Sequence, residues 1–124
     1  MDQKICLDTD ICIEIIKGRE IGVVRRIIDK QVFISAISAF ELYLRNTNLD
    51  AIDFFMNQIE ILSFDGNVAR LASSIDKELK ISGNILDLKD LFIAATCMAY
   101  NCKLLTLNRR HFERIKGLEL LDVK

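Results

Sequence analysis

The sequence predicts an α/β fold: one domain over residues 1–124, with a mainly parallel central sheet of four or five strands and helices on both faces. Short apolar runs alternate with amphipathic stretches along the chain, which is typical of strands joined by helical crossovers. The chain is 51% hydrophobic, enough for one substantial core. It has no proline and five glycines, so we expect helices joined by short turns and no flexible linker.

The strands are marked by short apolar runs with polar residues at their ends. The first run, Ile5-Cys6-Leu7, stops at Asp8-Thr9-Asp10, and the second is Val32-Phe33-Ile34. The expected strands cover residues 4–7, 32–34, 59–62 and 103–106, with a short fifth strand at one edge, residues 118–122.

The helices are marked by capping residues and by apolar periodicity. Thr9 or Asp10 can cap a first helix, which Gly18 ends. Asp65 can cap a long helix, and Asp87 opens the most apolar one, whose apolar residues cover several faces and indicate burial. The expected helices cover residues 11–17, 21–30, 35 or 38 to about 46, 49–57, 65–81 and 87–100.

Composition excludes several classes of protein. No run of about 18 apolar residues suggests a membrane span, and no leader pattern opens the chain, so we expect a cytoplasmic protein. The net charge of −1 excludes a polycation, so nucleic-acid binding would depend on a local site. The four cysteines form no C-x-x-C pair and are expected to be reduced, mostly buried thiols.

The reactive side chains that remain are carboxylates. His111 is the only histidine, which excludes a mechanism with two imidazoles, and no G-x-S-x-G turn supports a catalytic triad. We interpret His111 as a solvated or phosphate-contacting residue. No glycine-rich nucleotide-binding motif is present.

Three acids occupy positions where burial is expected. Asp8 follows the first strand, Glu41 interrupts an apolar helix, and Asp90 opens the apolar run of the last long helix. A buried carboxylate is costly unless it is paired or binds a metal. Ligands in parallel sheets bind beyond the carboxyl ends of the strands, so we expect folding to gather these acids around Mg²⁺, which Mn²⁺ can replace.

Each polar residue of this set also has a structural explanation. Asp8 and Asp10 can cap a helix, and capping is the better explanation for Asp10. Glu41 can lie on a solvent-exposed face, Asp90 can complement a helix dipole, and Asn108 can be a turn residue. Their joint order along the chain favours the metal site.

That order resembles the PIN domain family, and within it the VapC-like ribonuclease toxins of type II toxin–antitoxin systems. The similar segments are Leu7-Asp8-Thr9-Asp10, Ile34 to Leu42, Asp90 to Ala95, Leu104 to Phe112, and Ile115 to Leu118. The resemblance implies a single PIN-like nuclease domain that cleaves single-stranded or loop RNA with a metal-activated water.

The resemblance also implies roles for individual residues. Asp8, Glu41 and Asp90 would be the catalytic acids: Asp8 and Asp90 as direct metal ligands, and Glu41 as a further ligand or as the residue that positions the water. Asn108 would orient a ligand or a metal-bound water. Two positions depart from the pattern: Asn108 replaces an acid, and Asp10 stands where a small polar residue is commoner. Asp10 can restore the missing charge, and one or two metals remain open.

Further residues are expected around the ligands and along the RNA. Ser38 and Thr106, together with Asp10, are expected to hydrogen-bond around the metal ligands. RNA is expected along a basic cluster, for which an ordinary solvated helix face is the alternative. That basic cluster consists of Arg109, Arg110, Arg114 and Lys116.

The resemblance implies two partners, a second copy of the chain and a cognate antitoxin that occludes the acidic site. The apolar residues Ile52, Phe54, Phe55, Met56 and Ile59 support such a surface, although core packing is the simpler use. Two other functions stay open: a catalytically weak or inactive PIN-like RNA-binding module, suggested by the neutral Asn108, and an assembly protein without metal.

Overall fold

The fold is built on one four-stranded parallel sheet with the strand order β3-β2-β1-β4. The computed structural model describes residues 3–19 and 21–122. Its strands are β1 Lys4–Leu7, β2 Gln31–Ser35, β3 Glu60–Leu62 and β4 Lys103–Leu105. The predicted α/β class with a parallel sheet is confirmed.

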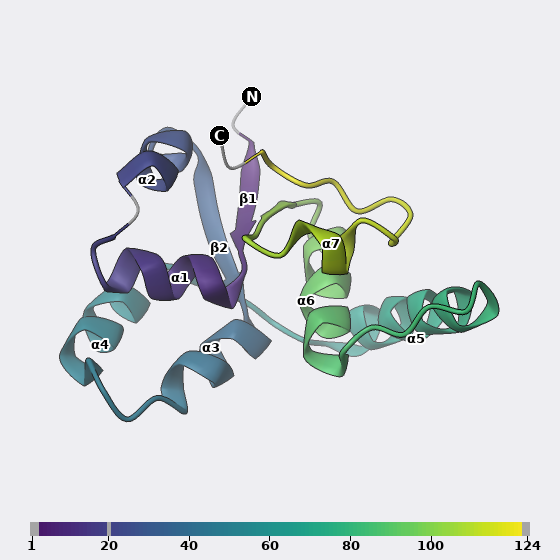
Figure 1. Ribbon diagram of the computed structural model, residues 1–124. Coiled ribbons are helices and arrows are strands. Elements are labelled where there is room, and N and C mark those ends of the chain that lie inside the picture. Colours follow the sequence, from purple (N-terminus) through teal and green to yellow (C-terminus); the bar gives the residue numbers. More distant parts are fainter. Residues whose placement is uncertain (1–2, 20, 123–124) are drawn as a thin grey trace.

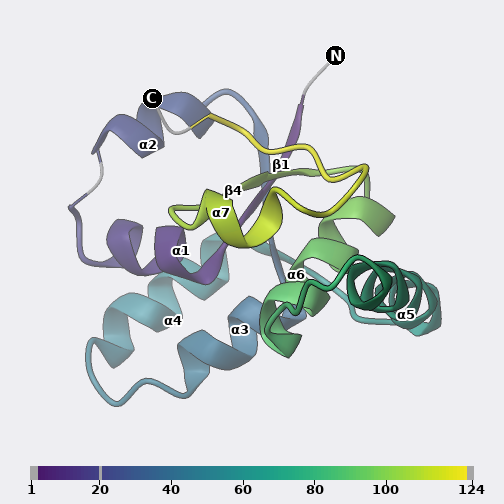
Figure 2. The same cartoon turned by 45° about the vertical axis from the view of Figure 1, so that its right-hand side comes forward.

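Helices cover both faces of this sheet. The helices are α1 Thr9–Ile16, α2 Ile21–Ile27, α3 Ala36–Tyr43, α4 Leu49–Gln58, α5 Gly66–Ile81, α6 Leu88–Ala99 and α7 Arg109–Phe112. Figure 1 shows α1 to α4 on one side of β1 and β2, and α5 and α6 on the other. The short helix α7, which was not predicted, lies on the side of α6, next to β4 (Figure 2).

The core forms one layer on each face of the sheet, because successive side chains of a strand point to opposite faces. Cys6 of β1 packs with buried residues of α5 and α6, and Phe112 of α7 joins the same layer. Ile5 and Leu7 point the other way and pack with residues of α1 to α4. The carboxyl ends of β1, β2 and β4 are therefore flanked by helices from both layers.

Several boundaries differ from those predicted. The cap of α1 is Asp8, not Thr9 or Asp10. Helix α2 ends at Ile27 rather than near residue 30, because a turn closes there with the Lys30 amide donating to the Ile27 carbonyl. The predicted caps Ser35 and Asp65 are confirmed, each accepting a hydrogen bond from the backbone of the helix it opens.

The predicted edge strand at residues 118–122 is wrong as a strand. Only an isolated parallel bridge joins Leu104 to Leu120. The Leu104 amide donates to the Glu119 carbonyl at 2.9 Å, and the Leu121 amide donates to the Leu104 carbonyl at 2.8 Å. The segment follows β4 for a single residue pair, too short for a ladder.

Two predictions about burial can be compared with the structure. All four cysteines are buried and free, as expected. Helix α4 uses its apolar residues in both proposed ways: Ile52 and Met56 belong to the core, whereas Phe54 is 69% exposed.

In residues 3–19 and 21–122, no helix combines the length and the apolar character needed to cross a bilayer.

Candidate functional site

Asp8 lies immediately after β1, at the carboxyl edge of the sheet. Its backbone amide donates to the Leu105 carbonyl at 2.9 Å, which extends the pairing with β4 by one residue. Its Oδ1 accepts the Thr9 amide at 2.8 Å, and its Oδ2 accepts the Thr106 hydroxyl at 2.6 Å. The side chain is thus held on both oxygens while only 5% of the residue is exposed.

The charge of Asp8 is poorly compensated. Burial raises its pKa from 3.8 to about 6, and the negative charges of Asp10 and Asp90 act in the same direction. Hydrogen bonds from Thr106 and Thr9 oppose this increase without cancelling it. A cation beside Asp8 would therefore be bound favourably.

Asp10 lies in the first turn of α1 and contacts the loop after β4. Its Oδ2 accepts the Leu107 amide at 3.2 Å. Its Oδ1 is buried and, among the described residues, has no hydrogen-bond partner. Burial raises its pKa, and the charge of Asp90 contributes in the same direction. Asp10 is therefore not the cap of α1 but a second carboxylate of the Asp8 cluster.

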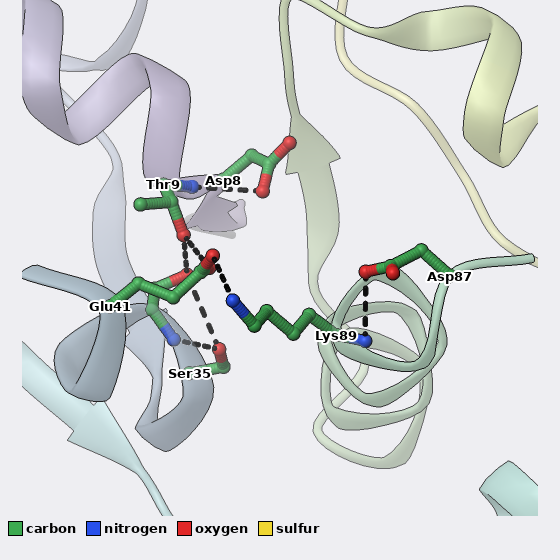
Figure 3. Close-up of polar contacts among 7 residues, drawn as sticks. Asp8, Thr9, Ser35, Glu41, Asp87 and Lys89 are labelled. Carbon is green, nitrogen blue, oxygen red and sulfur yellow. Dashed lines mark hydrogen bonds and ion pairs between the residues drawn. The ribbon is translucent and has the colours of Figure 1, made fainter.

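Glu41 reaches this edge of the sheet from α3. Its Oε1 accepts the Thr9 hydroxyl at 2.6 Å, and its Oε2 lies 3.8 Å from Lys89 Nζ. The Thr9 hydroxyl also lies 3.0 Å from Ser38 Oγ, and Ser35 accepts the Ser38 amide at 3.0 Å. Figure 3 shows Thr9 between Asp8 and Glu41, with Lys89 approaching Glu41 from α6.

Asp90 lies in the first turn of α6. Asp87 is the cap of that helix, accepting the Lys89 amide at 3.2 Å, so capping does not explain Asp90. Its Oδ2 lies 3.1 Å from His111 Nδ1. Burial raises the pKa of Asp90, His111 lowers it, and the charges of Asp87 and Glu41 raise it.

Asn108 is exposed and precedes α7 without capping it through its side chain. The backbone amide of Asn108 donates to the Thr106 hydroxyl at 3.0 Å, and that hydroxyl donates to Asp8 Oδ2. The backbone of Asn108 thus supports the hydrogen bond that orients Asp8, while its side-chain oxygen stays available for another ligand.

The basic cluster divides into two kinds of residue. Arg109 is half-buried, and its Nη1 donates to the Leu121 carbonyl at 3.1 Å. Arg114 Nη1 lies 3.4 Å from Asn84 Oδ1. Arg114 is exposed, as are Arg110 and Lys116. Arg109 therefore connects the segment around residue 121 to α7, whereas the other three basic side chains are exposed.

Sequence reasoning assigned no role at this site to Thr9, Lys89 or the His111–Asp90 contact. Thr9 and Lys89 each stand beside a candidate ligand in sequence, which is the only local signal for them. His111 belongs to α7, and Lys89 approaches Glu41 across the gap between α6 and α3. Only the packing of these helices brings the contacts about.

The donor set suits a hard divalent cation by its chemistry. It consists of carboxylate oxygens with hydroxyl and amide neighbours, which Mg²⁺ and Mn²⁺ prefer over softer metals. The buried, unpartnered Oδ1 of Asp10 is a free oxygen at the same edge. Across the described residues, however, no three acidic, histidine or cysteine side chains stand close enough to hold an ion without moving.

Comparisons with known proteins identify the family of this chain. The profile described as the PIN domain matches residues 5–118. "Ribonuclease VapC1" of Methanocaldococcus jannaschii is 32% identical, over 98% of this chain and 89% of the relative. "tRNA(fMet)-specific endonuclease VapC" of Shigella flexneri is 31% identical, over 96% of this chain and 97% of the relative.

Solved structures show the same fold. A DNA-bound VapBC structure from Salmonella typhimurium contains a chain with a TM-score of 0.89 and 28% identity, over 98% of this chain and 99% of that one. A chain of VapBC2 from Rickettsia felis, bound to a promoter DNA fragment, has a TM-score of 0.85 and 25% identity, over 96% and 98%.

Proposed function

This chain belongs to the PIN domain family, and we propose that it is a VapC-type endoribonuclease that requires Mg²⁺ and acts as the toxin of a toxin–antitoxin pair. The relatives named as ribonucleases match nearly the whole length of this chain. One observation carries the proposal: Asp8 is buried at the sheet edge with a pKa near 6, beside the charges of Asp10 and Asp90.

Asp8, Glu41 and Asp90 would hold the ion. A bound Mg²⁺ supplies charge at the scissile phosphate and lowers the pKa of water. Thr106 and Thr9 orient Asp8 through its two oxygens, and Thr9 also holds Glu41 through its hydroxyl. These contacts limit the rotamers of the two acids before substrate arrives, so less entropy is lost on binding.

Asp10 would supply the charge that position 108 lacks. The free Oδ1 of Asp10 supports this role, because a buried carboxylate oxygen without a donor is stabilised by a nearby cation. Asn108 would contribute a neutral oxygen, and Ser38 would support Thr9 through the hydroxyl contact at 3.0 Å. RNA would approach along the exposed Arg110 and Lys116.

The substrate would be single-stranded or loop RNA in the cytoplasm, cleaved at a phosphodiester bond. The decisive test compares the purified chain with Asp90→Asn on total RNA with mapped 5′ ends. We expect cleavage with Mg²⁺ by the wild type, none with EDTA, and a loss of roughly a hundredfold or more for the variant. Equal cleavage by the variant would contradict the role of Asp90.

A second candidate is a PIN-like module that binds RNA with little or no turnover. The neutral Asn108 and the ion pair of Glu41 with Lys89 favour it, because both reduce the negative charge available to a metal. It predicts RNA binding that does not change with EDTA. Cleavage that EDTA abolishes would exclude it.

The partner would be an antitoxin, because structures that share this fold include a toxin–antitoxin complex from Klebsiella pneumoniae and a member of the VapBC family of toxin–antitoxin systems from Mycobacterium tuberculosis. The surface supports such contact: a hollow of about 310 Å³ is bordered by side chains of α1, α2 and α4. Exposed apolar residues on α3 and at its C-cap support self-association into a homodimer, namely Phe40, Tyr43 and Leu44. Light scattering of the chain alone would measure that dimer.

A further inference from the structure

Lys89 places a positive charge beside Glu41, one of the candidate metal ligands. Its backbone is fixed at the start of α6, where its amide donates to the capping carboxylate of Asp87. Its side chain is 53% exposed and extends to Glu41, whose side chain is 24% exposed (Figure 3). The ammonium therefore links α6 to α3 through its contact with Glu41.

Helix stability does not explain this lysine. The first turn of a helix carries the positive end of the dipole, so a cation is disfavoured there and an acid is favoured. Asp87 and Asp90 follow that rule, whereas Lys89 stands between them and breaks it. Its side chain extends to Glu41 of α3, so its contact belongs to the acidic site and not to the capping of α6.

The contact with Glu41 is loose. A charge-assisted hydrogen bond between an ammonium and a carboxylate is about 2.7–2.9 Å long, whereas Nζ and Oε2 are 3.8 Å apart. The other oxygen of Glu41 is held by Thr9 at 2.6 Å. Lys89 can therefore leave Glu41 while Thr9 keeps that carboxylate in place.

We propose that Lys89 is a tethered cation of the acidic site, which neutralises Glu41 in the metal-free protein and binds a phosphate oxygen of the RNA once a divalent ion has taken its place. The inference rests on the proposed nuclease function. A fixed positive charge beside the ligands repels a divalent ion, and the same charge beside the ion attracts the substrate phosphate. Lys89 therefore weakens the binding of the divalent ion and strengthens the binding of the RNA phosphate.

Lys89→Met tests both effects, because methionine keeps a long apolar stem and removes the charge. We expect calorimetry to show Mn²⁺ binding roughly threefold to tenfold tighter than in the wild type. At saturating Mn²⁺, we expect RNA cleavage to fall roughly tenfold to a hundredfold in kcat/KM. A purely structural ion pair would not move the two measurements in opposite directions.

Two further variants sharpen the experiment. Lys89→Arg keeps the positive charge. It should bind Mn²⁺ with the weaker affinity of the wild type and keep most of the wild-type cleavage. Lys77→Met removes an exposed lysine of α5, on the opposite layer from α3, and should leave both measurements unchanged. Thermal unfolding of each variant verifies that the fold is kept.

Mn²⁺ affinity of Lys89→Met that equals or falls below that of the wild type would overturn the proposal. Cleavage by Lys89→Met at saturating Mn²⁺ that equals wild-type cleavage would also overturn it. If the wild type itself neither binds Mn²⁺ nor cleaves RNA, the proposed function fails first, and the role of Lys89 falls with it.

Discussion

Asp8 shows how one buried carboxylate can link a site to the stability of the fold. Its two oxygens are hydrogen-bonded, yet burial and two neighbouring acids still raise its pKa to about 6. The folded chain therefore binds a proton at Asp8 more tightly than the unfolded chain, whose carboxyl keeps its ordinary pKa of 3.8. At neutral pH, the ionised Asp8 therefore lowers the free energy of unfolding, and the same buried negative charge attracts cations.

The sign of the resulting pH dependence follows directly. The stabilising effect of the Asp8 proton is fully present below about pH 4 and is lost as the pH rises through about 6. Asp8→Asn carries no charge and keeps the capping preference at this position. Relative to the wild type, we expect the variant to gain about 2 kcal/mol of unfolding free energy between pH 4.5 and pH 7.5.

Urea denaturation without divalent ions measures this difference. Asp65→Asn, at the exposed cap of α5, is the matched control and should change little between the two pH values. A constant difference between Asp8→Asn and the wild type at both pH values would contradict the assigned cause.

Asp10 contacts the loop after β4, which also contains Asn108. A carboxylate at either of these two positions could therefore supply the same negative charge to the site. Asp10 accepts the Leu107 amide, and Leu107 directly precedes Asn108. We expect Asp10→Asn to weaken Mn²⁺ binding roughly tenfold, because a negative charge leaves the site. Adding Asn108→Asp to that variant should restore most of the affinity.

Calorimetric titration with Mn²⁺ of the two single variants and the double variant measures whether the charge at one position replaces the charge at the other. Asn108→Asp alone should bind Mn²⁺ more tightly than the wild type. If Asp10→Asn binds Mn²⁺ as tightly as the wild type, Asp10 does not contribute its charge to the site.

At the scale of elements, the sequence predicted which segments are strands and helices better than where they end. The buried strands β1, β2 and β4 and the capped helix α5 lie within a residue or two of the prediction. Helix α7 was missed because four residues carry too little periodicity to identify a helix, and residues 118–122 were wrongly predicted to form a strand. Their position depends on contacts with β4 and α6.

Arg109 and Arg110 provide a test of what α7 does. Arg109 donates to the Leu121 carbonyl, whereas Arg110 is exposed. We expect Arg109→Met to lose about 1–2 kcal/mol of unfolding free energy, because it leaves a carbonyl without its donor. Arg110→Met should stay within about 0.5 kcal/mol of the wild type.

RNA binding should rank the same two variants in the opposite order. Arg110→Met should weaken RNA binding. It should also reduce the slope of the logarithm of the RNA-binding constant against the logarithm of salt concentration by about one, the value for one phosphate contact. Urea denaturation and binding titrations at several salt concentrations measure both effects. Equal losses of stability in the two variants would contradict the separation of roles.

At the scale of the whole molecule, three candidate ligands come from three different elements. Asp8 follows β1, Glu41 lies on α3, and Asp90 lies on α6. The first two are linked through Thr9, and α6 belongs to the opposite layer of the core. An ion bound by all three would join the two layers and stabilise the folded chain.

We therefore expect Mg²⁺ to raise the melting temperature at pH 7.5. At about a hundredfold excess over the dissociation constant, binding contributes about 2.7 kcal/mol, or roughly 10 °C for a domain of this size. Asp90→Asn should show a much smaller increase. Scans with NaCl at matched ionic strength provide the control, and an equal increase with NaCl would exclude specific binding.

The sequence by itself determined the fold class, most of the elements and the order of the candidate acids, because apolar periodicity and capping are local properties of the chain. It did not determine which side chains meet. Thr106 and Asp8 are 98 positions apart, and Thr9 and Glu41 are 32 apart. Such contacts depend on how the helices pack against the sheet, so the hydrogen bonds that hold Asp8 and the contact of Lys89 with Glu41 were decided only by the tertiary structure.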